Sequence, residues 1–502
     1  MADLYQVSAA SCNRHLLDLP NEILQEIAGY LPTDRDVLHL SKTSKEAMSK
    51  IFAGESRVWR YRFGEKYEIP PGRTFAELKN EYVTRAIVLG RTQDFRQREE
   101  CTPTEELRQE FWMEIVQTML QEILTLPTKL LDSSYTLDYL KATLKDRATF
   151  LQFPKERGNR TELFYALQLC LSAVALDPSM KQHCRRSDYD METIYSIDKG
   201  LLATHEADDE FDNTNESETS SGSTTPVSTA SLDESGSEDD EESSEPSSEA
   251  SQLPVVTSKT PRPFVDHEKL DLDKLLQFRT FWQRHLLSSV ENTYHESYMQ
   301  LEDWIRPGVR KYDTSQGSTL SGFWLGYYSC IHPFPTTLEE LEHRQTCATH
   351  GEEPELMARL QMHLIFLRLT LTAQSLELVE SESLFWPKAC NKIVPLFEGL
   401  KTKRVPFEGI QDAYGGTEGN HVFGFVEDME IAYGGISGWQ RICFTLCERL
   451  GDEVAEVKEG TDGWVHIYEA LLIPGGRLMV GRWVDLKEPS AKGPFIFWST
   501  SS

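Results

Sequence analysis

Hydrophobic positions recur with a helical period over most of the first 300 residues. In residues 105–124, apolar side chains lie four residues apart on one predicted face, at Phe111, Ile115, Met119 and Ile123. This spacing predicts an amphipathic helix. Residues 135–151 and 162–176 predict further helices, and the helical pattern resumes over 264–304.

From Leu320 onward the pattern alternates between apolar and polar positions, as at Leu367, Leu369 and Leu371. Alternation with a period of two predicts strands, here in residues 321–330, 360–372, 375–382, 421–434, 439–450, 464–473 and 476–486. Turn signals separate them at 414–416, 434–435 and 474–476. We therefore expect an antiparallel β-barrel, with a sandwich as the alternative.

Glycines interrupt several of the predicted strands. They weaken strand pairing, but they suit bends in a barrel where a side chain would crowd the neighbouring strand. The glycines in question are Gly322, Gly326, Gly424 and Gly481.

Together these patterns predict an α+β chain. In chain order we expect a disordered tail (1–15), a three-helix unit (16–63), a helical region (64–202), a disordered acidic Ser-rich segment (203–260), a second helical stretch (261–310) and the antiparallel β-barrel (311–502).

Negative charge is concentrated in the acidic segment. The 502-residue chain has a net charge of −29, and residues 206–249 hold about 16 acids and no Lys or Arg. Such a segment buries too little apolar surface to offset its ordering entropy. Two interpretations stay open: a solvated loop, or a regulatory tract in which Ser231, Ser235 and Ser237 each precede an acid by three residues. The acidic balance argues against binding to nucleic acid or anionic membrane.

Cysteine spacing and catalytic motifs point away from a metalloprotein or an enzyme. None of the nine cysteines forms a CxxC pair, so we expect reduced thiols, no metal and no cofactor. The first 15 residues lack the pattern of a signal peptide, which predicts a cytoplasmic or nuclear protein. Phosphate-binding, hydrolase, zinc-protease and kinase signatures are missing from the sequence, which favours a non-catalytic role.

Residues 16–63 predict three short helices. Pro20 suits a first helical position, and Pro32 ends the helix that it starts. Thr33 begins a second helix, Thr43 with Glu46 has the spacing of a capping box for a third, and Trp59 closes the unit. So small a unit makes a weak core on its own, and an apolar stripe on the first helix predicts a partner surface.

This segment resembles the F-box of fungal F-box proteins in Leu19-Pro20, Glu22-Ile23-Leu24, Ile27, Leu31, Asp36-Val37, Leu40, Thr43-Ser44-Lys45 and Trp59. It departs from the family pattern at Val37, where Leu is commoner, and at Thr43, where Val is commoner. The resemblance implies binding to a Skp-family adaptor and, through it, a cullin-RING ubiquitin ligase. The residues that it places at the adaptor are Leu19, Pro20, Ile23, Leu24, Ile27, Leu31, Val37 and Leu40.

The C-terminal part is similar, more loosely, to the lipocalin-like barrel of fungal F-box proteins. The similarity rests on Gly322-Phe-Trp-Leu-Gly326-Tyr-Tyr328, on Phe407-Glu-Gly409 with Asp412 and Gly415, on 474–483 and on 493–498. It implies a domain that recruits protein substrates. The residues that could contact a ligand are Trp324, Tyr328, Trp386, His421, Trp439, Arg482 and Trp483.

Several of these barrel residues also have a structural interpretation. The tryptophans beside glycines suit the packing of the barrel, His421 suits a turn, and Arg482 could pair with Asp485 or Glu488.

The sequence thus predicts a substrate-recognition subunit of an SCF-type (Skp-cullin-F-box) ubiquitin ligase. Two alternatives remain: a barrel that senses a small apolar ligand and is coupled to the F-box, and an adaptor-bound F-box protein that acts outside a ligase.

Overall fold

The computed structural model describes residues 16–53, 55–95, 102–125, 134–152, 161–180, 188–195, 265–307 without 267, 268, 291 and 304, 320–329 without 321, 365–373, 386–394 without 387, 404–411, 420–447, 464–489 and 491–500. The predicted tail (1–15), the acidic segment (203–260), the predicted strand at 375–382 and the turn at 414–416 lie outside these residues.

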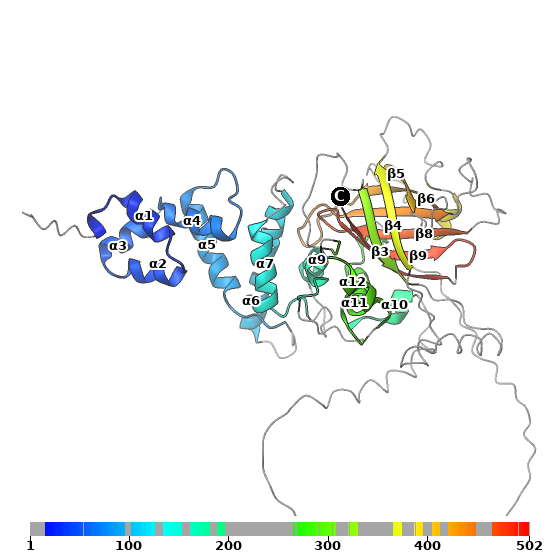
Figure 1. Ribbon diagram of the computed structural model, residues 1–502, viewed down its shortest axis with the longest axis horizontal. Helices are drawn as coiled ribbons and strands as arrows, with labels where there is room; N and C mark the ends of the chain where they lie inside the picture. Colours follow the sequence, from blue (N-terminus) through cyan, green and yellow to red (C-terminus); the bar gives the residue numbers. More distant parts are fainter. Residues whose placement is uncertain are drawn as a thin grey trace, which may run out of the picture. The chain divides into compact units, whose positions relative to one another are not determined.

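The N-terminal part is helical (Figure 1). A 3-10 helix, η1 (Leu16–Asp18), precedes α1 (Asn21–Gly29), α2 (Asp34–Ser41), α3 (Lys45–Ile51), α4 (Arg57–Lys66) and α5 (Phe75–Leu89). Their small core consists of Ala28, Val37, Ile51 and Val58, with Leu31, Leu40 and Phe52 packed against it.

Helix caps account for where α2 and α3 begin. Thr33 and Asp36 form a full capping box at α2, in which each side chain accepts a hydrogen bond from the other's backbone N–H at 3.1 Å. The predicted box at Thr43 is wrong, because the Ser44 side chain caps α3 by accepting from the Ala47 N–H at 2.9 Å. The Thr43 hydroxyl donates instead to the Leu40 carbonyl at 2.7 Å.

The helical region continues with α6 (Pro103–Thr125), α7 (Tyr135–Asp146), α8 (Glu162–Cys170), α9 (Ser172–Ala175) and α10 (Met191–Tyr195). The buried face of α6 contains Trp112, Val116, Met119 and Ile123, whereas Phe111 is 46% exposed. The predicted apolar face of this helix is therefore wrong at Phe111, its first residue. Trp112 takes the inward position because its ring packs against those of Phe95 and Phe150, at 5.4 and 5.3 Å between centroids.

A short hairpin opens the C-terminal part, formed by β1 (Val265–Asp266) and β2 (Lys269–Leu270). Helices α11 (Leu272–Leu287) and α12 (Asn292–Gln300) follow. They contact the outside of a β-barrel (Figure 1), where Tyr327 meets Tyr294 and Trp498 meets Tyr298, each at about 6.0 Å between ring centroids.

The barrel has eight antiparallel strands: β3 (Gly322–Tyr328), β4 (Ile365–Ala373), β5 (Arg404–Gln411), β6 (Asn420–Asp428), β7 (Gln440–Cys447), β8 (Val465–Leu472), β9 (Leu478–Asp485) and β10 (Lys492–Ser499). They pair in the order β10-β3-β4-β5-β6-β7-β8-β9 and close, so the sandwich alternative is wrong. The alternation had not predicted β5 or β10, which each contain a proline, Pro406 and Pro494.

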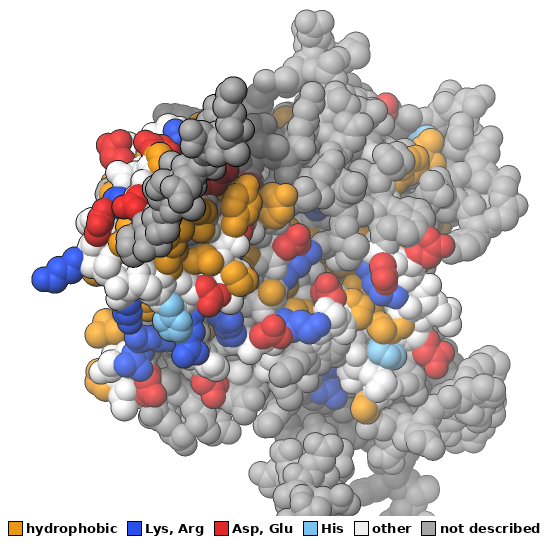
Figure 2. All heavy atoms as spheres, turned by 60° about the vertical axis from the view of Figure 1, so that its left-hand side comes forward, with side chains coloured by type: hydrophobic (Ala, Val, Ile, Leu, Met, Phe, Trp, Pro, Cys, Tyr) orange, Lys and Arg blue, Asp and Glu red, His pale blue; other side chains and the backbone are white. Residues whose placement is uncertain are grey.

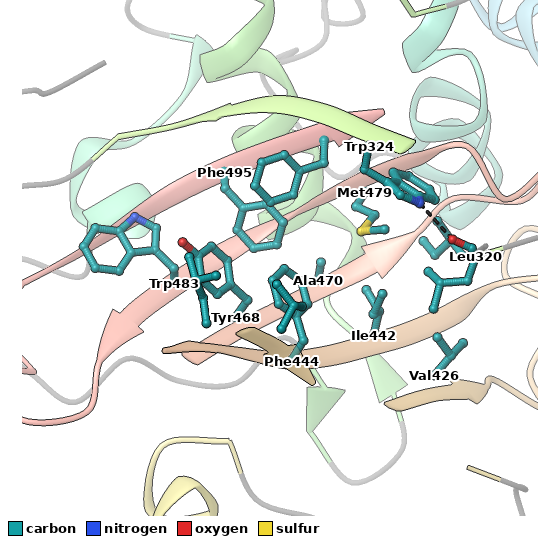
Figure 3. Packing of buried hydrophobic residues seen from close by; sticks show 14 of the residues in the cluster. Leu320, Trp324, Val426, Ile442, Phe444, Tyr468, Ala470, Met479, Trp483 and Phe495 are labelled. Carbon is teal, nitrogen blue, oxygen red and sulfur yellow. Dashed lines mark hydrogen bonds between the residues drawn. The ribbon is translucent and has the colours of Figure 1, made fainter. Parts of the chain in front are cut away.

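Large side chains fill much of the barrel interior (Figure 3). Phe444 stacks on Tyr468 at 4.5 Å, and Phe495 lies 5.1 Å from the same ring. Glycines within the strands allow neighbouring strands to approach each other closely. A Cβ on Gly424 would lie 2.1 Å from the Cys443 carbonyl, and Gly326 and Gly481 approach their neighbours equally closely, as predicted. The prediction is wrong for Gly322, where an added Cβ would meet no atom within 4 Å and the glycine instead has φ +136°.

Candidate functional site

Helix α1 presents a row of exposed apolar side chains. Ile23 is 43% exposed, Ile27 is 36% exposed and Tyr30, just after the helix, is 72% exposed. With the exposed Pro20, these residues are spaced by three or four and share one helix face. Tyr61 of α4 extends the row, since its ring centroid lies 5.9 Å from that of Tyr30. We call Pro20, Ile23, Ile27, Tyr30 and Tyr61 the α1 surface.

Figure 2 views the molecule with the N-terminal helices turned forward. Hydrophobic side chains gather on this side, and a group of Lys, Arg and His side chains lies near them. Proteins that bind a partner commonly present apolar patches rimmed by polar residues.

The residues that the resemblance assigned to an adaptor fall into three groups. Pro20, Ile23 and Ile27 are exposed, whereas Leu19, Leu31 and Leu40 are partly buried. Leu24 and Val37 are only 0% and 2% exposed and belong to the helical core. These two side chains pack beneath the α1 surface and are not accessible to a partner.

Sequence reasoning missed Tyr30 and Tyr61. Tyr30 lies seven residues after Ile23, so the helical period could have placed it on the α1 surface. Tyr61 could not have been found in this way, because it reaches the surface through the packing of α4 on α1, where its ring lies 3.3 Å from a Cβ built on Gly29.

Buried polar groups fix α1 in position. The Gln25 side chain donates to the Lys50 carbonyl at 3.0 Å and accepts from the Arg57 N–H at 3.1 Å. Arg62 donates to the carbonyls of Leu31 and Thr33 after the end of α1. These bonds join α1 to α3 and α4, so the helix that carries the α1 surface is held in place by hydrogen bonds to its neighbours.

Asp34 joins this unit to α5. It accepts from the Tyr82 hydroxyl at 2.7 Å and pairs with Lys66 at 3.1 Å. Burial of Asp34 opposes its ionisation, but the Tyr82 hydrogen bond and the Lys66 charge outweigh it and lower its pKa.

A second candidate site lies at one mouth of the barrel. A pocket of about 290 Å³ opens there. It is formed at the ends of β3 and β5–β8 and is lined by Tyr328, Gln411, Asn420, Leu446, Trp464 and His466.

Aromatic rings make up one side of this mouth. The His466 ring lies between the indoles of Trp464 and Trp483, at 4.5 and 4.7 Å between centroids. Its Nε2 lies 3.3 Å from a carboxylate oxygen of Asp485. Burial opposes the ionisation of Asp485, yet its hydrogen bonds to His466 and to two backbone N–H groups lower its pKa.

Three of the predicted contact residues point into the barrel: Trp324, Tyr328 and Trp483. Only Tyr328 of these lines the pocket. The Trp324 indole donates to the Leu320 carbonyl at 2.9 Å (Figure 3), and the Trp483 indole to the Ser329 carbonyl at 2.8 Å. Both indoles are packed and hydrogen-bonded, which agrees with the packing interpretation.

The other predicted residues lie elsewhere. Trp386 packs on the outside of the barrel against Phe425, at 5.3 Å between ring centroids. Trp439 is buried beside the β6–β7 turn and donates to the Ile436 carbonyl at 2.7 Å. His421 is a residue of β6 and not of a turn.

Arg482 belongs to a row of buried charges on the outer face of the barrel. It bonds Glu469 at 2.8 Å, and not Asp485 or Glu488 as expected. Glu469 also pairs with Arg441 at 2.8 Å, Arg441 with Glu427 at 3.0 Å, and Glu427 with Arg404 at 3.1 Å. Each Glu in this row lies between two Arg side chains, so both buried carboxylates have counter-charges.

Within the described residues, no helix is both long and apolar enough to cross a membrane, and no group of His, Cys, Asp and Glu side chains could hold a metal ion. Cys170, Cys390, Cys443 and Cys447 are free thiols.

Comparisons of the chain with protein-family models, curated proteins and solved structures find no match.

Proposed function

We propose that the chain is the substrate-recognition subunit of an SCF-type ubiquitin ligase, with an F-box in residues 16–63 that binds a Skp-family adaptor. The observation that carries the proposal is the α1 surface, an exposed apolar row in the segment that resembles an F-box. Exposed aromatic and aliphatic side chains on a rigid base are typical of the centre of a protein interface.

In this proposal the division of roles within the helical unit is clear. Ile23, Ile27 and Tyr30 would be desolvated by the adaptor, whereas Leu24 and Val37 hold the helices together. The chain would supply proximity, because a bound substrate is held near the cullin-bound catalytic subunits. Such a ligase subunit would work in the cytoplasm, the nucleus or both.

Adaptor binding is tested by placing charge on the α1 surface. We expect the double variant Ile23→Asp, Ile27→Asp to weaken binding of purified Skp-family adaptor at least tenfold, because both side chains are exposed and their loss should not unfold the unit. Ile431→Asp is the matched control, since Ile431 is 45% exposed on the β6–β7 connection. Unchanged adaptor binding by the double variant, with an intact thermal transition, would contradict the proposal.

Replacement of Leu19-Pro20 by Ala-Ala is a second test of the same interface. Leu19 is half-buried, so loss of binding counts only if circular dichroism shows the native helix content. Co-precipitation of a cullin then separates a ligase subunit from an F-box protein that acts with the adaptor alone. Quantitative proteomics after deletion of residues 16–63 would identify the proteins that accumulate.

The barrel is the proposed substrate-binding part. A sensor of a small apolar ligand would need an apolar cavity, but aromatic side chains occupy much of the interior. The pocket at the mouth has amide and imidazole groups among its lining residues, which favours a ligand of different chemistry.

A further inference from the structure

Two side-chain amides form a hydrogen-bonded pair at the rim of the barrel mouth. Gln411, the last residue of β5, pairs in register with Asn420, the first residue of β6, and the Asn420 amide N–H donates to the Gln411 side-chain oxygen at 2.8 Å. An amide side chain has an oxygen with two lone pairs and two N–H donors. This bond leaves the Asn420 oxygen as an acceptor and the Gln411 nitrogen as a donor, and both residues line the pocket.

The aromatic side of the mouth is fixed in orientation. The His466 ring lies between the indoles of Trp464 and Trp483, tilted by 37° and 45° to them, and its Nε2 lies 3.3 Å from the Asp485 carboxylate. Rings that are locked in this way lose little entropy when a flat molecule packs against them. Trp464, His466 and Tyr328 make half of the described lining residues of the pocket aromatic, while Trp483 lies behind His466.

The described part of the pocket offers no counter-charge to a charged ligand. Its described lining residues include no Lys, Arg, Asp or Glu. Asp485, behind His466, already accepts hydrogen bonds from the backbone N–H groups of Lys487 and Glu488 at 2.8 Å each. Against these described residues a charged ligand would lose hydration without gaining a counter-charge, which is unfavourable.

The size of the pocket limits the ligand. A volume of 290 Å³ corresponds to roughly ten water molecules at about 30 Å³ each. This is the lower end of the range of small-molecule sites and suits one or two fused rings.

We propose that the barrel mouth binds a neutral, planar small molecule that carries a hydrogen-bond donor and acceptor side by side, such as a lactam or a related heteroaromatic edge. Its donor would meet the Asn420 oxygen and its acceptor the Gln411 nitrogen, while its rings pack against Trp464 and His466. This site is independent of the α1 surface, and its test needs no adaptor.

The probe is isoquinolin-1(2H)-one, a neutral bicyclic lactam, titrated into the full chain by ligand-observed NMR. Three compounds of similar shape accompany it: isoquinoline, which lacks the N–H donor, 1-naphthoate, which is an anion, and 1-naphthylmethylammonium, which is a cation. We expect the lactam to bind at least tenfold more tightly than each of them. No detectable binding of the lactam up to its solubility limit, or equal or tighter binding of any comparison compound, would overturn the proposal.

A pair of isosteric variants locates the site. Gln411→Glu keeps an acceptor for Asn420 but replaces the donor that faces the ligand, and we expect at least a tenfold loss of lactam affinity. Asn391→Asp makes the same amide-to-carboxylate change at an exposed residue, which accepts from the Trp386 indole at 2.9 Å, and should leave affinity unchanged. If Gln411→Glu binds the lactam as the wild type does, the proposed site is wrong. A loss of affinity in Asn391→Asp equal to that in Gln411→Glu would also show that the proposed site is wrong.

Discussion

The side-chain amide of Gln117 donates a hydrogen bond of 2.6 Å to the carbonyl of Gly434, a residue 317 positions later in the chain. Four residues along the same helix, Gln121 donates to the Gly435 carbonyl at 2.6 Å. The Gly434 N–H in turn donates to the Glu162 carboxylate at the start of α8, also at 2.6 Å. The turn between β6 and β7 is therefore one place where the barrel binds the helices α6 and α8.

Gly434→Ala should destabilise the chain by about 2–4 kcal/mol, because it combines backbone strain with a clash. Gly434 has φ +55°, and an added Cβ would lie 2.8 Å from the Cβ of Ala166. Gly72→Ala is the matched control, since Gly72 has φ +81° and open space around it, and it should cost only about 1 kcal/mol. The free energy of unfolding in urea measures both, and equal losses would show that the docking contact contributes nothing.

The sequence predicted most of the described helices and six of the eight barrel strands, because periodicity depends on neighbouring residues alone. It was wrong at residues 265–270, which continue the predicted helical pattern but form the β1–β2 hairpin. It also predicted that glycines such as Gly424 would lie where strands come close. It missed β5 and β10, since a proline in a strand-like run counts against pairing. Pro406 and Pro494 are accommodated by the ladder, which only the three-dimensional pairing reveals.

The candidate sites were less predictable. Periodicity identified the apolar stripe of α1, but it could not separate Leu24, which faces the core, from Ile23, which faces solvent. That distinction depends on where α3 and α4 pack. The amide pair of Gln411 and Asn420 carries no sequence signal, because the two residues meet only through the register of β5 and β6.

Glu122 should make stability fall as the pH rises towards neutrality. Burial raises the pKa of its carboxyl to about 7, a shift that Arg85 opposes and Glu81 reinforces. The folded chain therefore holds a proton that the unfolded chain has released above its ordinary pKa of 4.5. This contribution is fully present below that value and is lost as the pH rises through about 7.

Glu122→Gln should remove most of this dependence, which amounts to about 1–3 kcal/mol between pH 5 and pH 8. Urea denaturation at four pH values across that range measures the slope. Glu110→Gln, an exposed change on the same helix, should leave the slope as it is in the wild type. An unchanged slope in Glu122→Gln would assign the pH dependence to other groups.

Glu469→Gln should destabilise the barrel by about 3 kcal/mol, because removal of one partner from a buried ion pair leaves the other uncompensated. Glu469 is 1% exposed and bonds both Arg441 and Arg482. Glu408→Gln, on the exposed side of β5, should change stability by no more than about 0.5 kcal/mol. Comparable urea midpoints for the two variants would contradict a stabilising role for the row of charges.

Tyr82→Phe tests whether α5 supports the α1 surface. The Tyr82 hydroxyl donates to Asp34 at 2.7 Å and accepts from Lys66 at 2.8 Å, while its ring packs 6.0 Å from that of Trp59. Phenylalanine keeps the ring contact and removes only the hydroxyl. We expect a loss of about 1–3 kcal/mol, since a hydrogen bond to a charged, partly buried group is lost.

The pH dependence of this variant distinguishes the bond from general packing. The lowered pKa of Asp34 stabilises the fold above its ordinary value of 3.8, and that stability is lost as the pH falls through the folded-state pKa. Without the Tyr82 hydroxyl the pKa of Asp34 should rise, so Tyr82→Phe should lose stability at a higher pH than the wild type during acid titration. Tyr135→Phe, at a tyrosine that is 57% exposed, should follow the wild type. If the acid transitions of Tyr82→Phe and the wild type coincide, Asp34 does not gain its stability from this hydrogen bond.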